Sequence, residues 1–577
     1  MSSGPIRMER QQRLRKRALP LIGLALVSFI VGAISGCPGN PNRDAAERYL
    51  EAWQAGDYPA MHSELSTISR QAVPLERFTE RYEEAGSLAT LQSIEPGEPG
   101  GDEAVVEIPV IASTLAFDEV EQSMKFTFGE DGVAWQSGLL FPGLEEGEEL
   151  ERTTRLPPRA SILAKDGQVM AEGPSLARSY PLGDSMIDVT GTVGAATKEL
   201  EPAEIAAGFS EGEPLGLSGI ELAYNSRLAG KPGGTLSAVA TEKSEGAEGR
   251  VLGEGEPEAA TPLKTTIDPV VQEAAVAALA GQDGGVAVID AKRGGIRALA
   301  GQAFSVLQPP GSTMKIVTAT AALETGAATL ESEYEYATSG VADGREIGNA
   351  YGEVCGGDFV ESFADSCNSV FAPLGMEIGE EQLTRTSEAF GFNEVPAIFD
   401  EAGTQAVDPP VPTIPQPGEY NNELGVSAIG QGKVQATPLL MASVAQAIAN
   451  GGLRVPTPIT VDKSLRPAAE PVRVTDPATA RLVTKSMVAA VTSGTGIYGA
   501  IPEAQVAGKT GTAEVGLRGD GSVDDEGNPA LVEDAWFSAF APADNPKLAI
   551  GVMIIDASAG GGTIAAPIAS QVLSAGL

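Results

Sequence analysis

Residues 309–326 read PPGSTMKIVTATAALETG, a pattern that predicts a helix beginning at Ser312 and ending at Gly326. Ser312 and Lys315, spaced i and i+3, would share one face of that helix. Lys315 could then reach the Ser312 hydroxyl, while the helix N-terminus offers N–H groups to an oxyanion forming beside it. Because a hydroxyl is a weak nucleophile, a neutral lysine would act as its base. The alternative is a capping serine followed by a surface lysine.

Composition narrows the chemistry open to this serine. The chain has 577 residues, long enough for three or four domains, and 78 acidic against 39 basic side chains give a net charge of −39. Such a surface repels a phosphate backbone, so nucleic acid is not an expected partner. With one histidine and three cysteines, the residues for a typical zinc site or a Ser-His-Asp triad are scarce.

A second lysine follows far along the chain. Lys509-Thr-Gly-Thr512 continues an apolar run, which predicts a strand whose alternation sends Lys509 and Gly511 to one face and Thr510 and Thr512 to the other. A glycine here lets a substrate backbone approach closely. The positive charge of Lys509, together with burial, would lower the pKa of Lys315. Alone, this motif would indicate only a glycine-bulged strand.

A third motif, Ser366-Cys-Asn368, lies between two helical stretches, so its hydroxyl and amide could point into a cleft. The plainer interpretation is a helix cap. Cys355 and Cys367 stand 12 residues apart, and a disulfide that braces this segment is a hypothesis for an exported protein.

The flanking pattern predicts one sheet built from both ends of the C-terminal region. A helix over 270–280 precedes a β-hairpin over 285–300, and two further strands lie at 535–540 and 548–555, before an Ala-rich helix over 563–577. The central helical block therefore lies between strands that are distant in sequence.

The region before it divides into two parts. Residues 41–147 begin with helical periodicity and continue with short strands, as in an α+β domain. Residues 150–262 are rich in Gly, Glu and Pro with short apolar strands, which indicates a β-rich pedestal.

In order, S-x-x-K at Ser312, S-x-N at Ser366 and K-T-G at Lys509 resemble the penicillin-binding protein and serine β-lactamase superfamily. The resemblance is strong over 263–577 and implies a transpeptidase-like α/β sandwich, an antiparallel sheet flanked by helices. Residues 150–262 are similar to the dimerisation domain of class B penicillin-binding proteins. The domain over 41–147 resembles nuclear-transport-factor-2-like domains, so a multidomain α+β chain is expected.

The resemblance implies a role for each motif residue. Ser312 would be acylated, Lys315 would be its base, Ser366 would relay the proton to the leaving amine, and Asn368 would orient the donor amide. Lys509 would supply a positive field and, with Thr510 and Thr512 beside Gly511, hold the donor carboxylate. The N–H groups of Ser312 and Thr512 would form the oxyanion hole. No cofactor or metal is implied, and Asp534, where many relatives have histidine, has no assigned role.

The implied reaction is a serine D,D-transpeptidation that cross-links peptidoglycan stem peptides, with β-lactams as mimics of the donor. A membrane glycan polymerase is an expected partner, because no polymerising module precedes the pedestal. The same motifs would also suit a β-lactamase or β-lactam sensor, although the E-x-x-L-N motif of class A enzymes is absent. A catalytically silent cell-wall scaffold is the other alternative.

The first 37 residues predict export. A cluster of arginines and lysines over 7–17 precedes an uncharged, largely apolar run over 18–36, as in a signal or anchor segment. The run ends at Ile34-Ser-Gly-Cys37, which resembles a bacterial lipobox, so Cys37 is a candidate lipidation site. Otherwise 18–36 would remain as a single transmembrane helix. Either anchor places the rest on the outer face of the cell membrane.

Overall fold

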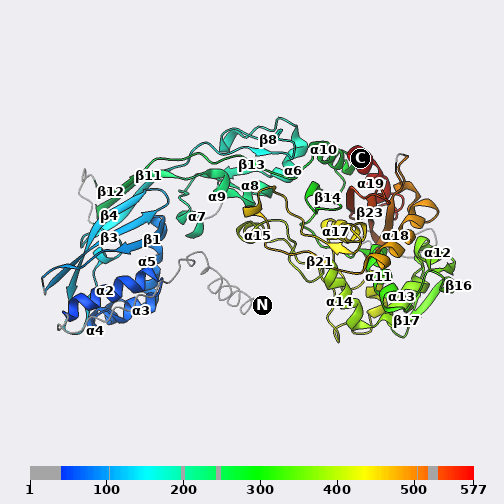
Figure 1. Ribbon diagram of the computed structural model, residues 1–577, viewed down its shortest axis with the longest axis horizontal. Coiled ribbons are helices and arrows are strands. Elements are labelled where there is room, and N and C mark those ends of the chain that lie inside the picture. The colour runs from blue at the N-terminus through cyan, green and yellow to red at the C-terminus, as the bar shows by residue number, and fades with distance from the viewer. Residues whose placement is uncertain are drawn as a thin grey trace. The chain divides into compact units, whose positions relative to one another are not determined.

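The computed structural model describes residues 40–577 except 103, 196–199, 201, 242–248, 503 and 518–530 (Figure 1). The predicted signal segment and Cys37 lie outside these residues. The chain forms two compact units: one contains the chain up to Arg159 with 195–214 and 229–260, and the other contains 160–194, 215–228 and 261–577. Among the helices of the described residues, none has both the length and the apolar character of a membrane span.

The first unit begins with four helices, α2 (Pro41–Gln54), α3 (Tyr58–Ser63), α4 (Thr67–Ala72) and α5 (Leu75–Leu88), and polar residues cap the first three. The side chains of Asn40, Asp57 and Ser66 each accept a hydrogen bond from a first-turn N–H. Helix α2 buries Tyr49 and Trp53, one turn apart, against the sheet that follows.

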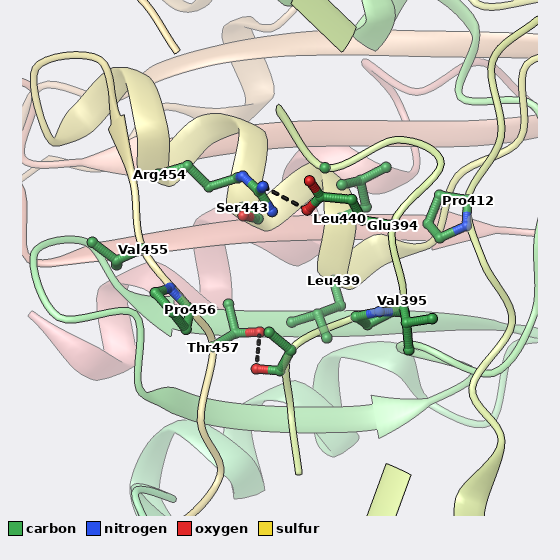
Figure 2. Close-up of a pocket in the computed structure, with 13 residues that line it drawn as sticks. Glu394, Val395, Pro412, Leu439, Leu440, Ser443, Arg454, Val455, Pro456 and Thr457 are labelled. Carbon is green, nitrogen blue, oxygen red and sulfur yellow. Dashed lines mark hydrogen bonds and ion pairs between the residues drawn. The ribbon is translucent and has the colours of Figure 1, made fainter. Parts of the chain in front are cut away.

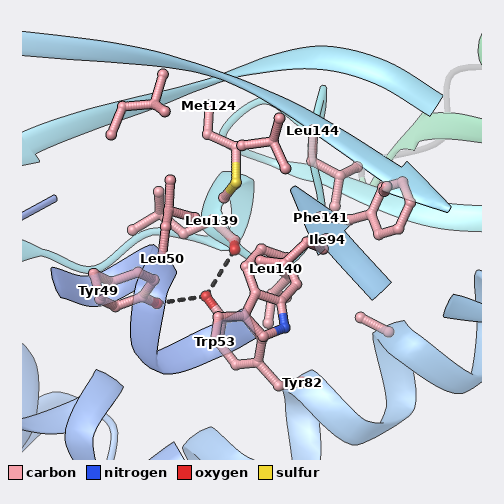
Figure 3. Packing of buried hydrophobic residues seen from close by; sticks show 14 of the residues in the cluster. Tyr49, Leu50, Trp53, Tyr82, Ile94, Met124, Leu139, Leu140, Phe141 and Leu144 are labelled. Atoms are coloured by element: carbon pink, nitrogen blue, oxygen red, sulfur yellow. Dashed lines mark hydrogen bonds between the residues drawn. The ribbon is translucent and has the colours of Figure 1, made fainter. Parts of the chain in front are cut away.

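That sheet is antiparallel and has the order β1-β3-β4-β5, with β2 paired to β3. Its strands are β1 (Leu91–Pro96), β2 (Gly100–Gly101), β3 (Val105–Thr114), β4 (Glu119–Phe128) and β5 (Val133–Ala134). Figure 3 shows part of the core, where the Tyr49 and Tyr82 hydroxyls meet at 2.5 Å and Tyr82 donates to the Leu139 carbonyl at 2.7 Å. Helices followed by a sheet confirm the α+β prediction, whereas the nuclear-transport-factor-2-like assignment stays a prediction.

Residues 150–262 contribute to both units rather than forming one separate body. In the first unit, β6 (Glu148–Arg155), β11 (Gly233–Ala240) and β12 (Arg250–Gly255) form an antiparallel sheet in the order β12-β11-β6. In the second unit, β7 (Ile162–Leu163), β8 (Val169–Ala171) and β13 (Leu263–Lys264) form a mixed sheet, in which β7 is antiparallel to β8 and parallel to β13. The remaining elements of this segment are β9 (Val193–Ala195), β10 (Pro214–Gly216), α6 (Ile187–Thr190), α7 (Pro202–Ala206), α8 (Gly219–Ala223) and α9 (Asn225–Ala229).

The main sheet of the second unit has the order β15-β14-β24-β23-β22, with every neighbouring pair antiparallel. Its strands are β14 (Gly284–Asp290), β15 (Ile296–Gly301), β22 (Ala507–Leu517), β23 (Leu531–Ala541) and β24 (Leu548–Ile554). Strand β14 pairs directly with β24, more than 250 residues later. The prediction of one sheet built from both ends of the region is therefore confirmed.

Helices cover both faces of this sheet. On one face, α10 (Pro269–Leu279) and α19 (Ala565–Gly576) share a hydrophobic core with the strands. On the other, α17 (Pro438–Ala449) packs so closely that a Cβ on Gly551 of β24 would lie 2.0 Å from the Pro438 carbonyl oxygen. The predicted sandwich is thus observed, and both predicted flanking helices are present.

A mainly helical lobe lies between the strands of the sheet in sequence. Its helices are α11 (Lys315–Thr325), α12 (Phe359–Ala364), α13 (Asn368–Ile378), α14 (Glu380–Phe390), α15 (Glu401–Val407), α16 (Leu424–Ala428) and α18 (Pro477–Thr492). Its short strands are β16 (Glu333–Ala337), β17 (Ser339–Ala342), β18 (Arg345–Gly348), β19 (Cys355–Asp358), β20 (Leu453–Arg454) and β21 (Val472–Arg473).

Candidate active site

Ser312 lies in a 3-10 turn, Gly311–Met314, and the α-helix proper begins at Lys315. The prediction that the helix begins at Ser312 is therefore wrong by one turn. In a 3-10 turn the side chains at i and i+3 eclipse, so the turn keeps Ser312 and Lys315 on one side. Among the described residues, however, the hydrogen bonds of Lys315 Nζ go to Ser366 and Asn368 and not to Ser312. The turn begins at Gly311, whose φ of +52° lies in the left-handed region.

The serine turn packs against β22 at the predicted carboxylate-binding strand. A Cβ on Gly311 would lie 2.6 Å from the Thr512 carbonyl oxygen, and the Gly311 N–H donates to the Gly430 carbonyl at 2.9 Å. Only a glycine allows this approach without displacement. The two segments expected to supply oxyanion-hole N–H groups, at Ser312 and Thr512, are therefore neighbours.

Lys315 is fully buried, and its ammonium nitrogen contacts the second motif. Its Nζ donates to the Ser366 carbonyl at 2.6 Å, to Ser366 Oγ at 3.2 Å and to Asn368 Oδ1 at 2.7 Å. The same nitrogen lies 5.6 Å from the centre of the Phe371 ring. Burial first, and then the charge of Lys509, hold the pKa of Lys315 well below its usual value. A lysine in this environment gives up its proton more readily than a lysine in water.

Lys509 is also fully buried, in β22 beside helix α12. Its Nζ donates to the Thr510 carbonyl at 3.1 Å and lies 5.7 Å from the centre of the Phe363 ring. Burial lowers the pKa of Lys509 to about 7, and the Asp365 carboxylate opposes that shift. Both lysines of the site are therefore buried amines with a lowered pKa.

Ser366 and Cys367 lie between α12 and α13, as predicted, but Asn368 is the first residue of α13. Ser366 has a φ of +64°, in the left-handed region that non-glycine residues rarely adopt. Cys367 forms a disulfide with Cys355, with a Cα–Cα distance of 5.8 Å. The Asn368 side chain also donates to the Gly348 carbonyl at 2.9 Å. Its amide is therefore held at both ends, by Lys315 and by the end of β18.

The remaining predicted residues lie along β22 as a row of buried or half-buried side chains. The Thr510 hydroxyl contacts the Thr495 hydroxyl at 2.6 Å, and Thr512 Oγ1 accepts a hydrogen bond from the Gly561 N–H at 3.3 Å. A Cβ on Gly511 would lie 2.7 Å from the Pro310 carbonyl oxygen. The sequence predicted that a substrate backbone approaches Gly511 closely. In the structure, the backbone of Pro310, just before Ser312, makes this close approach.

Sequence reasoning missed three contributors that contact the motif residues: Thr495, Gly561 and Tyr351. Thr495 also donates to the Ala364 carbonyl at 3.3 Å. The stretch Gly494-Thr-Gly496 and the triple glycine over 560–562 are visible in the sequence and could have pointed to the first two. Nothing in the local pattern around Tyr351 signals a role.

Asp534, the position without an assigned role, lies on β23 opposite Ala513 of β22 and is buried. One carboxylate oxygen accepts from the Asp556 N–H at 3.0 Å, while Oδ2 has no hydrogen-bond partner among the described residues. Burial raises the pKa of Asp534. His62, the one histidine, bonds the Val73 carbonyl at 2.8 Å in the first unit and takes no part in the site.

A separate pocket lies near the start of α17 and the end of α14 (Figure 2). Arg454 and Glu394 form an ion pair of 2.6 Å at its rim, and the Thr457 hydroxyl donates to the Ala397 carbonyl at 3.2 Å. None of the predicted site residues lines it.

Comparisons with known proteins agree with this geometry. The family profile for the penicillin binding protein transpeptidase domain matches residues 284–574, and that for the penicillin-binding protein dimerisation domain matches 172–263. The chain is similar to peptidoglycan D,D-transpeptidase PbpA of Mycolicibacterium smegmatis, with 34% identity over 296 residues. That match covers 48% of this chain and 57% of the relative. To MrdA of Acinetobacter baumannii it is 27% identical, over 66% of this chain and 63% of the relative.

Solved structures share the fold. A D,D-transpeptidase domain from Eggerthella lenta superimposes with a TM-score of 0.56 at 25% identity, covering 73% of this chain and 98% of that one. PBP2 of Pseudomonas aeruginosa gives a TM-score of 0.58 at 24% identity, covering 74% and 97%. At 24% identity, this second likeness shows the fold alone.

Proposed function

Because the chain belongs to the penicillin-binding proteins that carry a transpeptidase domain, we propose that it is a serine D,D-transpeptidase acting on peptidoglycan stem peptides. The observation that carries the proposal is the environment of Lys315. This fully buried residue begins the helix that follows Ser312, and its Nζ contacts Ser366 and Asn368. A buried amine held one turn after a serine is equipped to act as a general base.

In the acylation step, Lys315 removes the proton of the Ser312 hydroxyl as the oxygen attacks the carbonyl carbon of a D-Ala-D-Ala amide. The carbonyl oxygen becomes an oxyanion, which the N–H groups of Ser312 and Thr512 stabilise. When the C–N bond breaks, the leaving D-Ala amine receives a proton by way of Ser366, whose hydroxyl lies 3.2 Å from Lys315 Nζ. An ester on Ser312 remains.

In the second step, an amine of a neighbouring stem peptide attacks this ester. The attacking nitrogen gives up a proton to the Lys315 and Ser366 pair as it bonds to the carbonyl carbon. The C–O bond to Ser312 then breaks, the new amide forms, and the pair passes this proton to the serine oxygen. The products are a cross-link and a free enzyme. Water in place of the amine would give the corresponding carboxypeptidase reaction.

Lys509, Thr510 and Thr512 bind the terminal carboxylate of the donor in this proposal. The pKa of Lys509 is about 7, so a bound carboxylate, by attracting the proton, would favour its charged form. Asn368 is proposed to have a further part besides orienting the donor amide, because its side chain oxygen accepts from Lys315 and its amide donates to the Gly348 carbonyl. It acts first as a positioning residue for the base.

β-Lactams are proposed as covalent inhibitors, since they present the same carbonyl and carboxylate to Ser312. One solved structure of the same fold is PBP3 of Mycobacterium tuberculosis in complex with aztreonam. A membrane glycan polymerase is proposed as a partner. The basic and apolar N-terminal segment supports a location at the outer face of the cell membrane, anchored by lipid at Cys37 or by residues 18–36.

Mass spectrometry of the exported part after benzylpenicillin treatment tests the proposal. We expect one adduct on the peptide containing Ser312, none in Ser312→Ala, and an unchanged adduct in Ser369→Ala. Ser369 is a matched control because its buried hydroxyl follows Asn368 and has no hydrogen-bond partner among the described residues. An adduct that persists in Ser312→Ala would refute the assignment. Release of the adduct within seconds would favour a β-lactamase, and no adduct at all would favour a scaffold.

A further inference from the structure

Tyr351 reaches across the candidate site from the helical lobe to the sheet. It lies between β18 and β19 with a φ of +54°, and 69% of its surface is exposed. Yet its hydroxyl donates to Glu533 Oε2 of β23 at 3.0 Å. Tyr351 has an unfavourable backbone conformation and yet reaches a carboxylate 182 positions away. We infer that the surrounding structure holds it in place.

The loop that carries Tyr351 is fixed by two asparagines. The Asn349 side chain donates to the Ala337 and Glu353 carbonyls at 2.8 and 2.9 Å and accepts from the Ser369 N–H at 2.8 Å. Asn368, which contacts Lys315, holds the end of β18 through Gly348. The position of Tyr351 is therefore tied directly to the helix that begins with Asn368.

The Tyr351 hydroxyl meets the residue proposed to bind the donor carboxylate. The Thr512 side chain is near enough to this hydroxyl to lower its pKa slightly. A Cβ on Gly560 would lie 2.8 Å from Thr512 Oγ1 and 3.1 Å from the Tyr351 hydroxyl oxygen, so both oxygens border one small space. Burial and the Glu533 charge raise the pKa of Tyr351 to about 12, which keeps it a hydrogen-bond donor at neutral pH.

We propose that Tyr351 is a specificity-determining residue that binds the donor carboxylate together with Thr512, and that Glu533 occupies its hydroxyl until the donor arrives. This inference rests on the proposed transpeptidase function. The phenol O–H exchanges one carboxylate acceptor for another, so no hydrogen bond is lost on binding, and Glu533, which is half-buried, returns to water. The residue thus selects donors that carry a free carboxylate beside the scissile bond.

The test compares acylation rate constants for benzylpenicillin and its methyl ester, which lacks the carboxylate charge. We expect Tyr351→Phe to slow acylation by the acid about tenfold, and acylation by the ester less than about twofold, because a hydrogen bond to a charged group is lost only with the acid. Glu533→Gln weakens the competing acceptor, so acylation by the acid should become about threefold faster.

Tyr336→Phe is the matched control. The Tyr336 hydroxyl donates to Glu361 at 2.7 Å in the same lobe, and the residue is 59% exposed, so the variant loses the same kind of surface bond away from Thr512. Equal rates for Tyr351→Phe and Tyr336→Phe, or equal losses with acid and ester, would overturn the inference while leaving the transpeptidase proposal intact. Failure of the unmodified protein to acquire an adduct on Ser312 would overturn both.

Discussion

Breaking the disulfide between Cys355 and Cys367 should slow acylation of Ser312 as well as reduce stability. Cys367 stands between Ser366 and Asn368, the two residues that contact Lys315 Nζ, and both cysteines are buried. The bond therefore ties the second motif to β19. Dithiothreitol, or replacement of both cysteines by alanine, removes this link without touching the base itself.

The size of the effect follows from the structure. A disulfide that closes 12 residues lowers the entropy of the unfolded chain enough to stabilise the fold by about 3 kcal/mol. Ser366 is held in the left-handed region, a conformation that costs on the order of 1–3 kcal/mol. If the relaxation of Ser366 raises the activation free energy of acylation by about 1.4 kcal/mol, acylation slows roughly tenfold.

The assays are urea unfolding followed by circular dichroism and stopped-flow acylation by a fluorescent penicillin. Dithiothreitol should slow acylation of the native protein and should not change the acylation rate of the double variant Cys355→Ala/Cys367→Ala. Acylation at the native rate in that variant, despite the loss of stability, would refute the positioning argument. An unchanged unfolding midpoint would refute the entropy argument.

Two further predictions concern charge. The acylation rate should rise with pH as Lys315 loses its proton and fall above about pH 7 as Lys509 loses its own. Lys509→Met removes a charge that lowers the pKa of Lys315, so the rise should move to higher pH. A rise at the same pH in this variant would contradict the coupling between the two lysines. Arg178→Ala should lower the free energy of unfolding, measured in urea, by about 3 kcal/mol, because it removes a charged group that lies 2.7 Å from the fully buried carboxylate of Glu221. The exposed Arg155→Ala is the control and should change stability by less than about 1 kcal/mol; equal losses in the two variants would contradict the argument.

Local sequence patterns predicted the main sheet of the second unit and two of the helices that cover it. The hairpin of β14 and β15, the strands β23 and β24, and the helices α10 and α19 were all expected within a few residues, except that β23 begins earlier. The start of α11 was misplaced because a 3-10 turn and an α-helix share the i, i+3 spacing at Ser312 and Lys315. The distribution of residues 150–262 over two units was not predictable, since composition does not reveal which core a short strand joins.

By itself, the sequence singled out the residues proposed to carry the chemistry, since the motifs at Ser312, Ser366 and Lys509 are local spacings that helix and strand periodicity can express. Only the tertiary structure decided what each side chain touches. The acceptors of Lys315 come from residues 51 and 53 positions away, and the carboxylate that holds Tyr351 from one 182 positions away. Such contacts depend on how distant segments pack into one core, and no periodicity within a segment encodes its partner.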